Sequence, residues 1–184
     1  MNIVVLQDHL RSGGTERQSL LLARAFGAAG HSSTLVTFRP GGALAEAAGD
    51  LPRRVLQSRD TGLDWFAPGL TRTVAGLAPD IVLCMGRMAN CYGGHLAVRL
   101  PRAAVVATLR TGKTLPWLFR RTLRRAAHVV ANSHETRTLL LTRQGLAPAR
   151  VSTIHNSLVF PSTVAAEIGQ QWRAAHGAGP GTTV

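Results

Sequence analysis

Short runs of apolar, mostly β-branched residues alternate along this chain with longer segments in which apolar residues recur every three or four positions. The short runs are typical of strands that are buried on both faces, and they lie at 2–6, 33–38, 53–57, 80–85, 103–109, 128–132 and 151–155. The longer segments predict helices at 14–29, 62–77, 88–100, 115–127, 134–144 and 163–176. This repeated strand–helix–strand order predicts an α/β fold, a Rossmann-like doubly wound parallel sheet with helices on both faces.

Residues at the ends of these segments mark their limits. Ser12 or Gly13 can cap the first helix, and Asn132 with Glu135 three residues later resembles a capping box. Beyond the last predicted strand the chain changes to a polar helix followed by a Gly- and Pro-rich stretch. We therefore predict one domain over 1–160, and over 161–184 an interdomain helix and linker with the first residues of a further domain.

The composition is that of a folded domain with excess positive charge. The chain has 184 residues, of which 45% are hydrophobic, and its 21 Lys and Arg against 9 Asp and Glu give a net charge of +12. Such a surface attracts phosphate in nucleotides, anionic lipids or nucleic acids. No zinc, helix-turn-helix or RNA-recognition pattern is present and only 5% of residues are aromatic, so no specific nucleic-acid partner is predicted.

The cysteine content and the apolar runs bear on cofactors and location. The spacing of Cys84 and Cys91 fits no common zinc pattern, so we expect free thiols and neither a metal nor another cofactor. No apolar run approaches the ~18 residues of a membrane span, and the N-terminus lacks the pattern of a signal peptide. The expected location is therefore cytoplasmic.

The glycine pair Gly13 and Gly14 directly follows the loop after the first strand. Ligands of open parallel sheets bind at the carboxyl ends of the strands, and a helix N-terminus behind glycines offers free N–H groups to a phosphate. The pair fits a diphosphate site, or a tight turn with no ligand. Plain dinucleotide binding is disfavoured, because the G-x-G-x-x-G pattern is not completed.

Three longer segments resemble the N-terminal half of family-4 retaining glycosyltransferases. They are "GGTERQSLLLARAFGAAGH" (13–31), "PDIVLCMGRMAN" (79–90) and "AHVVANSHETRTLLLTRQGLAPARVSTIHNSL" (127–158). The resemblance implies a GT-B fold of two Rossmann domains, in which the N-terminal domain binds the acceptor and the C-terminal domain binds a nucleotide sugar. It also implies a cell-surface polysaccharide, glycolipid or lipid-linked glycan as the acceptor.

The resemblance further implies roles for individual residues. Arg110 stands in a loop where many members carry a histidine near the reaction centre, and an arginine binds negative charge but does not act as a base. Asn132, Ser133 and Asn156 also fit a simple helix cap and a turn. The residues that would face the donor phosphates and the cleft are Gly13, Gly14, Thr15, Asn132, Ser133 and Asn156. The second segment adds Arg87 and Asn90 on the acceptor side.

One departure from the family concerns the donor. Members usually carry an E-x7-E pair in the C-terminal domain, and the glutamates of this chain, at 16, 46, 135 and 167, form no such pair. We therefore expect the donor-binding half to be missing from these residues, and the chain by itself to be inactive.

A different class of protein is suggested by Ala107–Thr114, which fits a loosened Walker A pattern. It would make the protein a P-loop nucleotide hydrolase. Ala107 replaces the first glycine of that pattern, and Pro116 would remove a backbone donor from the helix that should follow the lysine. A non-catalytic anion-binding module is the remaining alternative.

The predicted helix at 115–127 is strongly basic on one side. At 100° per residue its arginines fill an arc of about 140° that also contains Trp117. Tryptophan among arginines suits an anionic membrane surface, and it equally fits a solvated face on which the tryptophan packs against a loop. The arginines of this candidate acceptor or membrane surface are Arg120, Arg121, Arg124 and Arg125. A peripheral position at the inner membrane face is therefore one expected location.

Overall fold

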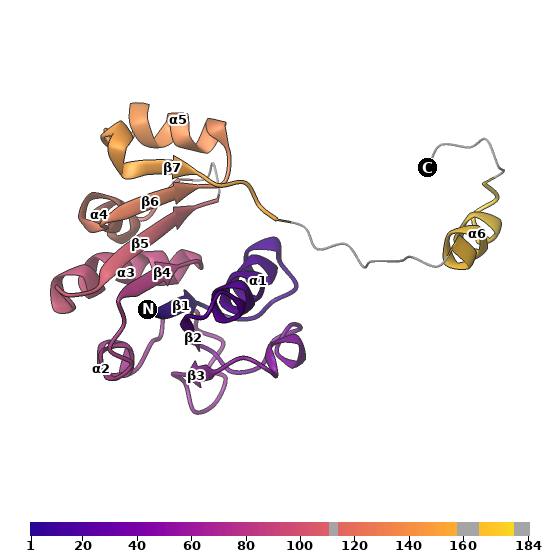
Figure 1. Cartoon of the computed structure of the whole chain (residues 1–184), viewed down its shortest axis with the longest axis horizontal. Coiled ribbons are helices and arrows are strands. Elements are labelled where there is room, and N and C mark those ends of the chain that lie inside the picture. Colours follow the sequence, from indigo (N-terminus) through magenta and orange to yellow (C-terminus); the bar gives the residue numbers. More distant parts are fainter. Residues whose placement is uncertain (111–113, 158–165, 179–184) are drawn as a thin grey trace.

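The computed structural model describes residues 1–110, 114–157 and 166–178 (Figure 1). Its strands are β1 (Asn2–Gln7), β2 (Ser32–Thr37), β3 (Arg53–Val55), β4 (Ile81–Cys84), β5 (Ala104–Leu109), β6 (His128–Ala131) and β7 (Val151–Thr153). Its α-helices are α1 (Gly14–Ala28), α2 (Leu70–Gly76), α3 (Arg87–Arg99), α4 (Trp117–Arg125), α5 (His134–Thr142) and α6 (Ala166–Ala175). Two 3-10 turns are η1 (Glu46–Ala48) and η2 (Pro148–Arg150).

The strands form one parallel sheet of seven strands in the order β3-β2-β1-β4-β5-β6-β7. The chain winds outward from β1 in one direction and from β4 in the other, so the order reverses between these two central strands. Right-handed crossovers then place α1 on one face and α3 on the opposite face. The predicted doubly wound Rossmann-like fold is confirmed.

Alternate residues of each strand supply the cores of the two faces. Ile3 and Val5 of β1 pack in one cluster with Leu20 of α1. Val4 and Leu6, which point the other way, pack with residues of α2 and α3. Further along the sheet, α4 and α5 bury their apolar side chains against β5 and β6. Figure 1 shows α1 on one side of the strands and α2, α3 and α4 on the other.

On the α1 side, the sheet beyond α1 carries an open apolar groove of about 340 Å³. Leu83, Val106 and Val130 of three successive strands line it, together with Phe26 of α1 and Ile154. Ile154 is more than half exposed. In the described residues, therefore, the α1 side of β4, β5 and β6 is covered less completely than the side of α2 to α5.

The predicted helix over 62–77 is wrong in its first half, since α2 begins only at Leu70. Residues before it form turns around the buried side chain of Gln57, whose amide donates to Leu63 O at 2.9 Å and Phe66 O at 2.6 Å. Gly69, the N-cap of α2, has a left-handed backbone with φ 66°. Helical periodicity does not reveal such a loop, because a glutamine side chain outside the segment satisfies its carbonyl groups.

Candidate substrate cleft at the carboxyl edge of the sheet

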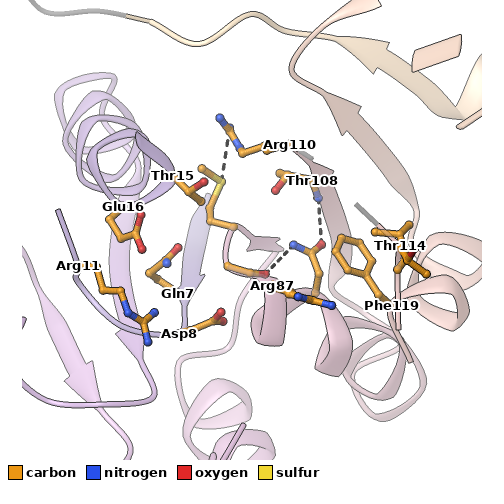
Figure 2. A pocket seen from close by; sticks show the side chains of 14 residues that line it. Gln7, Asp8, Arg11, Thr15, Glu16, Arg87, Thr108, Arg110, Thr114 and Phe119 are labelled. Carbon is orange, nitrogen blue, oxygen red and sulfur yellow. Dashed lines mark hydrogen bonds between the residues drawn. The ribbon is translucent and has the colours of Figure 1, made fainter. Parts of the chain in front are cut away.

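A cleft of about 300 Å³ opens where β1, β4 and β5 end (Figure 2). Loops at the reversal point of a doubly wound sheet diverge to opposite faces, which leaves such a crevice. Figure 2 shows Thr15 and Glu16 on one side of the cleft and Thr108 and Arg110 on another. The lining residues are Gln7, Asp8, Arg11, Thr15, Glu16, Met85, Gly86, Arg87, Asn90, Thr108, Arg110, Thr114, Leu115 and Phe119.

At the N-terminus of α1 the Glu16 carboxylate lies against Gly13, and a Cβ added at Gly13 would overlap it. Of the two predicted caps, Ser12 and Gly13, the N-cap is Gly13, with φ −76° and ψ 165° and no side-chain hydrogen bond. The amides of Gly14, Thr15 and Glu16 belong to the first turn, whose N–H groups have no intrahelical partner, and no other described group accepts from them. A Cβ added at Gly14 would meet nothing within 4 Å. Thr15 and Glu16 line the cleft, and Gly14 lines the adjoining groove.

The N-terminus of α3 is closed by a carboxylate. Its N-cap, Gly86, has φ −75° and ψ 165°. Asp8, which follows β1, accepts hydrogen bonds from Met88 N at 2.9 Å and Ala89 N at 2.6 Å. A Cβ at Gly86 would overlap the Asp8 carboxyl group. Only glycine therefore fits at position 86 while the carboxylate stays in place.

Asp8 is the most perturbed carboxyl group that lines the cleft. Its side chain is buried, with 6% of the residue exposed. Burial raises its pKa to about 6, while the two backbone N–H groups act in the opposite direction. This residue changes charge near neutral pH, and its charge contributes to the potential inside the cleft.

Arg110 follows the end of β5 and carries positive charge into the cleft. Its guanidinium contacts Met85 Sδ at 3.9 Å and donates to Asn156 Oδ1. Its Nε is buried and has no hydrogen-bond partner among the described residues. Burial lowers the pKa of this arginine, although an arginine keeps its charge. The group is placed to meet an anion in the cleft.

Asn90 is in the cleft wall, but its amide is engaged with backbone groups. Its Nδ2 donates to Cys84 O at 3.1 Å and Gly86 O at 2.8 Å, and its Oδ1 accepts from Thr108 N at 3.1 Å. These bonds tie the ends of β4 and β5 to α3. Asn90 thus fixes the shape of the cleft, while Arg87 lines it from the first turn of α3.

Asn132 and Ser133 form the start of α5. The N-cap is Ser133, whose Oγ accepts from Thr136 N at 3.1 Å, while Asn132 Oδ1 accepts from the Thr136 hydroxyl at 3.2 Å. The capping box expected from Asn132 and Glu135 is therefore wrong by one position. The reason is that β6 ends at Ala131 and Ser133 has the extended backbone of a cap. Neither residue lines the cleft.

The segment after β7 is held against α1 by a side chain that sequence analysis missed. Gln18 donates through Nε2 to Ser157 O, and its Oε1 accepts from Ser157 N at 3.1 Å. Asn156 and Ser157 line a groove that also contains Gly14. The structure thus brings Gly14, Arg110 and Asn156 to one edge of the molecule.

Arg11 and Asp8 were also missed by sequence analysis. Arg11 pairs with Asp64 at 2.5 Å, and Arg39 pairs with the same carboxylate at 2.8 Å. This network holds the loop after β1 against the turns before α2. One signal could have identified Asp8: Gln7 and Asp8 are polar and directly follow a buried apolar run. Residues at the end of such a strand lie at the carboxyl edge of the sheet, where ligands bind.

Other predicted residues lie away from the cleft or outside the description. Trp117 and the arginines of α4 do not line the cleft. Of the Walker-like segment, residues 111–113 lie outside the described residues, and α4 begins only at Trp117, after Pro116. No group of three or more His, Cys, Asp or Glu side chains that could hold a metal occurs in the described ranges. In these same ranges no helix has the length and apolar content needed to cross a membrane.

A seven-stranded doubly wound parallel sheet with an open cleft at its reversal point defines a Rossmann-like half-domain of the GT-B type. The model of Glycosyltransferase Family 4 matches residues 12–158, and the chain belongs to this family. No curated protein matches the chain. Family membership takes the place of the P-loop interpretation.

Solved glycosyltransferases share the fold. A glycosyltransferase from Rickettsia africae superposes with a TM-score of 0.70 at 18% identity, over 98% of this chain and 51% of its own. Alr3699/HepE of Anabaena, solved in complex with UDP, gives 0.69 at 19% identity, over 96% and 50%. An alpha-glucosyltransferase in complex with UDP and a DNA 13-mer gives 0.57 at 16% identity, over 85% and 42%. The chain spans about half the length of these proteins.

Proposed function

We propose that this chain is the acceptor-side half of a retaining glycosyltransferase. The complete enzyme moves a sugar from a nucleotide sugar to a polysaccharide or glycolipid precursor of the cell surface, and the isolated half is inactive. The family match supports sugar transfer, and UDP bound to a solved structure of the same fold supports a nucleotide sugar as donor. We place the domain boundary after residue 160; residues 158–165 and 179–184 lie outside the described residues, so the linker and the strand expected at the end of the chain stay predictions.

The observation that carries this proposal is that the first backbone amides of α1 have no hydrogen-bond partner in the described residues, whereas those of α3 are bonded to Asp8. Gly14, Thr15 and Glu16 offer amides without protein partners at the edge of the cleft. Backbone N–H groups at a helix start, together with the helix dipole, bind phosphate groups. In the proposed complex the diphosphate of the donor lies between these amides and the donor-binding half.

The chemistry needs charge stabilisation more than a base. The bond between the anomeric carbon and the diphosphate oxygen breaks, the acceptor oxygen bonds to that carbon on the same face, and the departing diphosphate takes the acceptor proton. Arg110 and the α1 amides stabilise the charge that develops on the diphosphate. Thr15 and Asn156 complete this side of the cleft, and Arg87 faces the acceptor. We propose that Asn132 and Ser133, which do not line the cleft itself, act at its mouth only indirectly, by positioning the chain segment after β6.

The diphosphate site is tested with inorganic pyrophosphate and ¹⁵N-labelled chain. We expect pyrophosphate to shift the amide resonances of Thr15 and Glu16, and we expect Gly14→Val to abolish the shifts. Gly27→Val is the matched control, because Gly27 lies on the same helix and a Cβ there also meets nothing within 4 Å. Absence of shifts in the unaltered chain, or equal shifts in the Gly14 variant, would contradict the proposal.

The inactivity of the half is tested separately. Residues 1–184 are incubated with a panel of nucleotide sugars, and release of nucleotide is measured. We expect no release above the uncatalysed rate, because the groups that bind the donor lie in the other half. Turnover by these residues alone would show that this division of labour is wrong.

A further inference from the structure

A second surface, away from the cleft, has the chemistry of a binding site. It is formed by α3 and α4 together and is called here the α3–α4 surface. Neither helix contains an aspartate or a glutamate. Apart from Arg87, which lines the cleft, the exposed arginines of the two helices are Arg99, Arg120, Arg121, Arg124 and Arg125.

The two helices form one continuous surface because they approach closely. Gly93 and Gly94 of α3 lie against Thr122 of α4, and Gly94 N donates to Thr122 Oγ1 at 2.6 Å. A Cβ at Gly94 would lie 3.1 Å from the Thr122 backbone. Glycine inside a helix costs about 1 kcal/mol relative to alanine. The pair is explained by this close approach, which brings the arginines of both helices onto one side.

The positive charge on this surface is not neutralised by the protein. The ion pairs of the described residues join Arg11, Arg24 and Arg39 to aspartates in other parts of the molecule. None of the arginines of the α3–α4 surface is in an ion pair within the described ranges. A partner with negative charge would therefore gain their full attraction.

A cavity of about 420 Å³ lies between the two helices, in the centre of these charges. Arg99 and His95 line it from α3, and Arg121 and Arg125 line it from α4. Guanidinium groups bind phosphate through paired N–H donors. The cavity is large enough for a phosphate group and offers it three arginines.

Apolar side chains surround the same cavity. Val98 and Leu118 line it, and they are 56% and 40% exposed. Trp117, on the turn of α4 that leads to the cavity, is 67% exposed. A tryptophan between a charged and an apolar environment is typical of the membrane interface, whereas a solvated helix face has no need of these residues.

We propose that the α3–α4 surface docks on an anionic phospholipid bilayer, with a lipid phosphate in the cavity and Trp117, Leu118 and Val98 in the headgroup layer. The proposal rests on the proposed function, because a membrane-bound acceptor explains why the enzyme would dock. Phe119 lines the cleft while its neighbour Leu118 lines the cavity. Docking therefore brings the cleft to within about one helix diameter, ~10 Å, of the bilayer.

The proposal is tested by co-sedimentation with vesicles of phosphatidylcholine containing 30% phosphatidylglycerol, and with pure phosphatidylcholine vesicles. We expect binding only to the anionic vesicles. In Arg121→Gln/Arg125→Gln, binding weakens about 25-fold, because each basic residue near an anionic surface contributes about fivefold. The matched control is Arg53→Gln/Arg54→Gln, which removes the same charge from β3 at the edge of the sheet and weakens binding less than threefold.

A second pair of variants tests the apolar contribution. We expect Trp117→Ala to weaken vesicle binding, and Trp65→Ala, which removes another exposed tryptophan, to leave it unchanged. Thermal melts confirm that each variant is folded. Equal losses in both arginine doubles, or no binding to anionic vesicles, overturn the proposal.

Nucleic acid is the other polyanion to compare. Tighter binding of a 20-base-pair duplex than of anionic vesicles, with the same dependence on Arg121 and Arg125, also overturns the proposal. Gly14→Val, which tests the cleft, leaves vesicle binding unchanged. A failure of the cleft proposal and a failure of the docking proposal are thus distinguishable.

Discussion

The helices α1 and α3 begin in the same way at neighbouring strands, and a carboxylate lies against each N-cap glycine, yet in the described residues only the first amides of α3 are hydrogen-bonded to it. Gly13 and Gly86 are their N-caps, with φ of −76° and −75° and the same ψ of 165°. At α3 the buried carboxylate of Asp8 accepts from the first amides. At α1 the corresponding amides have no partner among the described residues. The comparison teaches that the fold brings two helix N-termini to its centre and that at one of them a carboxylate of the chain itself accepts hydrogen bonds from the first amides.

The largest effect on stability is expected at Gly86, the N-cap of α3. Gly86→Val places side-chain atoms where the Asp8 carboxyl group lies. Overpacking of a buried site, with loss of the capping carboxylate, is expected to lower the free energy of unfolding by at least about 3 kcal/mol. Urea unfolding measures it. A loss under about 1 kcal/mol would show that Asp8 moves aside at little cost.

The charge of Asp8 predicts a pH effect. Its pKa is raised by burial from the ordinary value of 3.8 to about 6 in the folded chain. The folded state therefore holds this proton more tightly than the unfolded state, so the stabilisation is complete below pH ~4 and is lost as the pH rises through ~6. The difference in unfolding free energy between the unaltered chain and Asp8→Asn should fall by up to about 3 kcal/mol over this window.

The difference between the unaltered chain and the Asp8→Asn variant isolates the contribution of Asp8. Asp50 and Asp60 have lowered pKa values because of their hydrogen bonds to Arg24 and Arg39, and they destabilise the fold as the pH falls below ~4. They do so in the unaltered chain and in Asp8→Asn alike, so their contribution cancels from the difference in unfolding free energy. A constant difference from pH 4 to 7 would mean that Asp8 keeps an ordinary pKa.

A smaller loss of stability is expected at α5, where the side chain of the N-cap residue itself accepts a backbone hydrogen bond. At α5 the Ser133 hydroxyl accepts from Thr136 N at 3.1 Å. Ser133→Ala removes this bond and is expected to cost about 1 kcal/mol. Thermal unfolding measures the loss, and Ser12→Ala, at an exposed position outside the helices, is the control. Equal midpoints for the two variants would contradict the capping role.

The smallest effect on stability is expected at Gly14, in the first turn of α1. Gly14→Ala adds a methyl group that meets nothing within 4 Å, at a position where alanine favours the helix. We expect a stability change within about 0.5 kcal/mol, in the stabilising direction. Denaturant unfolding measures the stability change of Gly14→Ala, with Gly86→Val as the variant for comparison. A large destabilisation would show that the first turn of α1 has no room for a side chain at position 14.

Sequence analysis could predict the features that are encoded locally. The apolar runs identified the strands, and the glycine pair marked the start of α1. Asp8 could not be assigned as the cap of α3, because eighty residues separate Asp8 from Met88 and only the pairing of β1 with β4 brings them together. The Gln18–Ser157 contact is hidden for the same reason.

The loop before α2 and the start of α5 show a second limit. Gln57 organises the loop through its side chain, and apolar periodicity carries no information about such a polar centre. At α5, two adjacent residues can each accept a hydrogen bond, and the end of β6 decides which one is the cap. Patterns therefore identify elements more securely than the polar contacts that end them.

The apolar groove beside α1 has a practical consequence. Leu83, Val106 and Val130 line it, and Ile154 is 58% exposed. Parallel sheets in proteins are covered on both faces, and a hydrophobic patch left in contact with water promotes non-specific self-association. We therefore expect residues 1–184 produced by themselves to self-associate at high concentration, and mild detergent to reduce this self-association. This groove adjoins the cleft, since Met85, Thr108 and Arg110 line both.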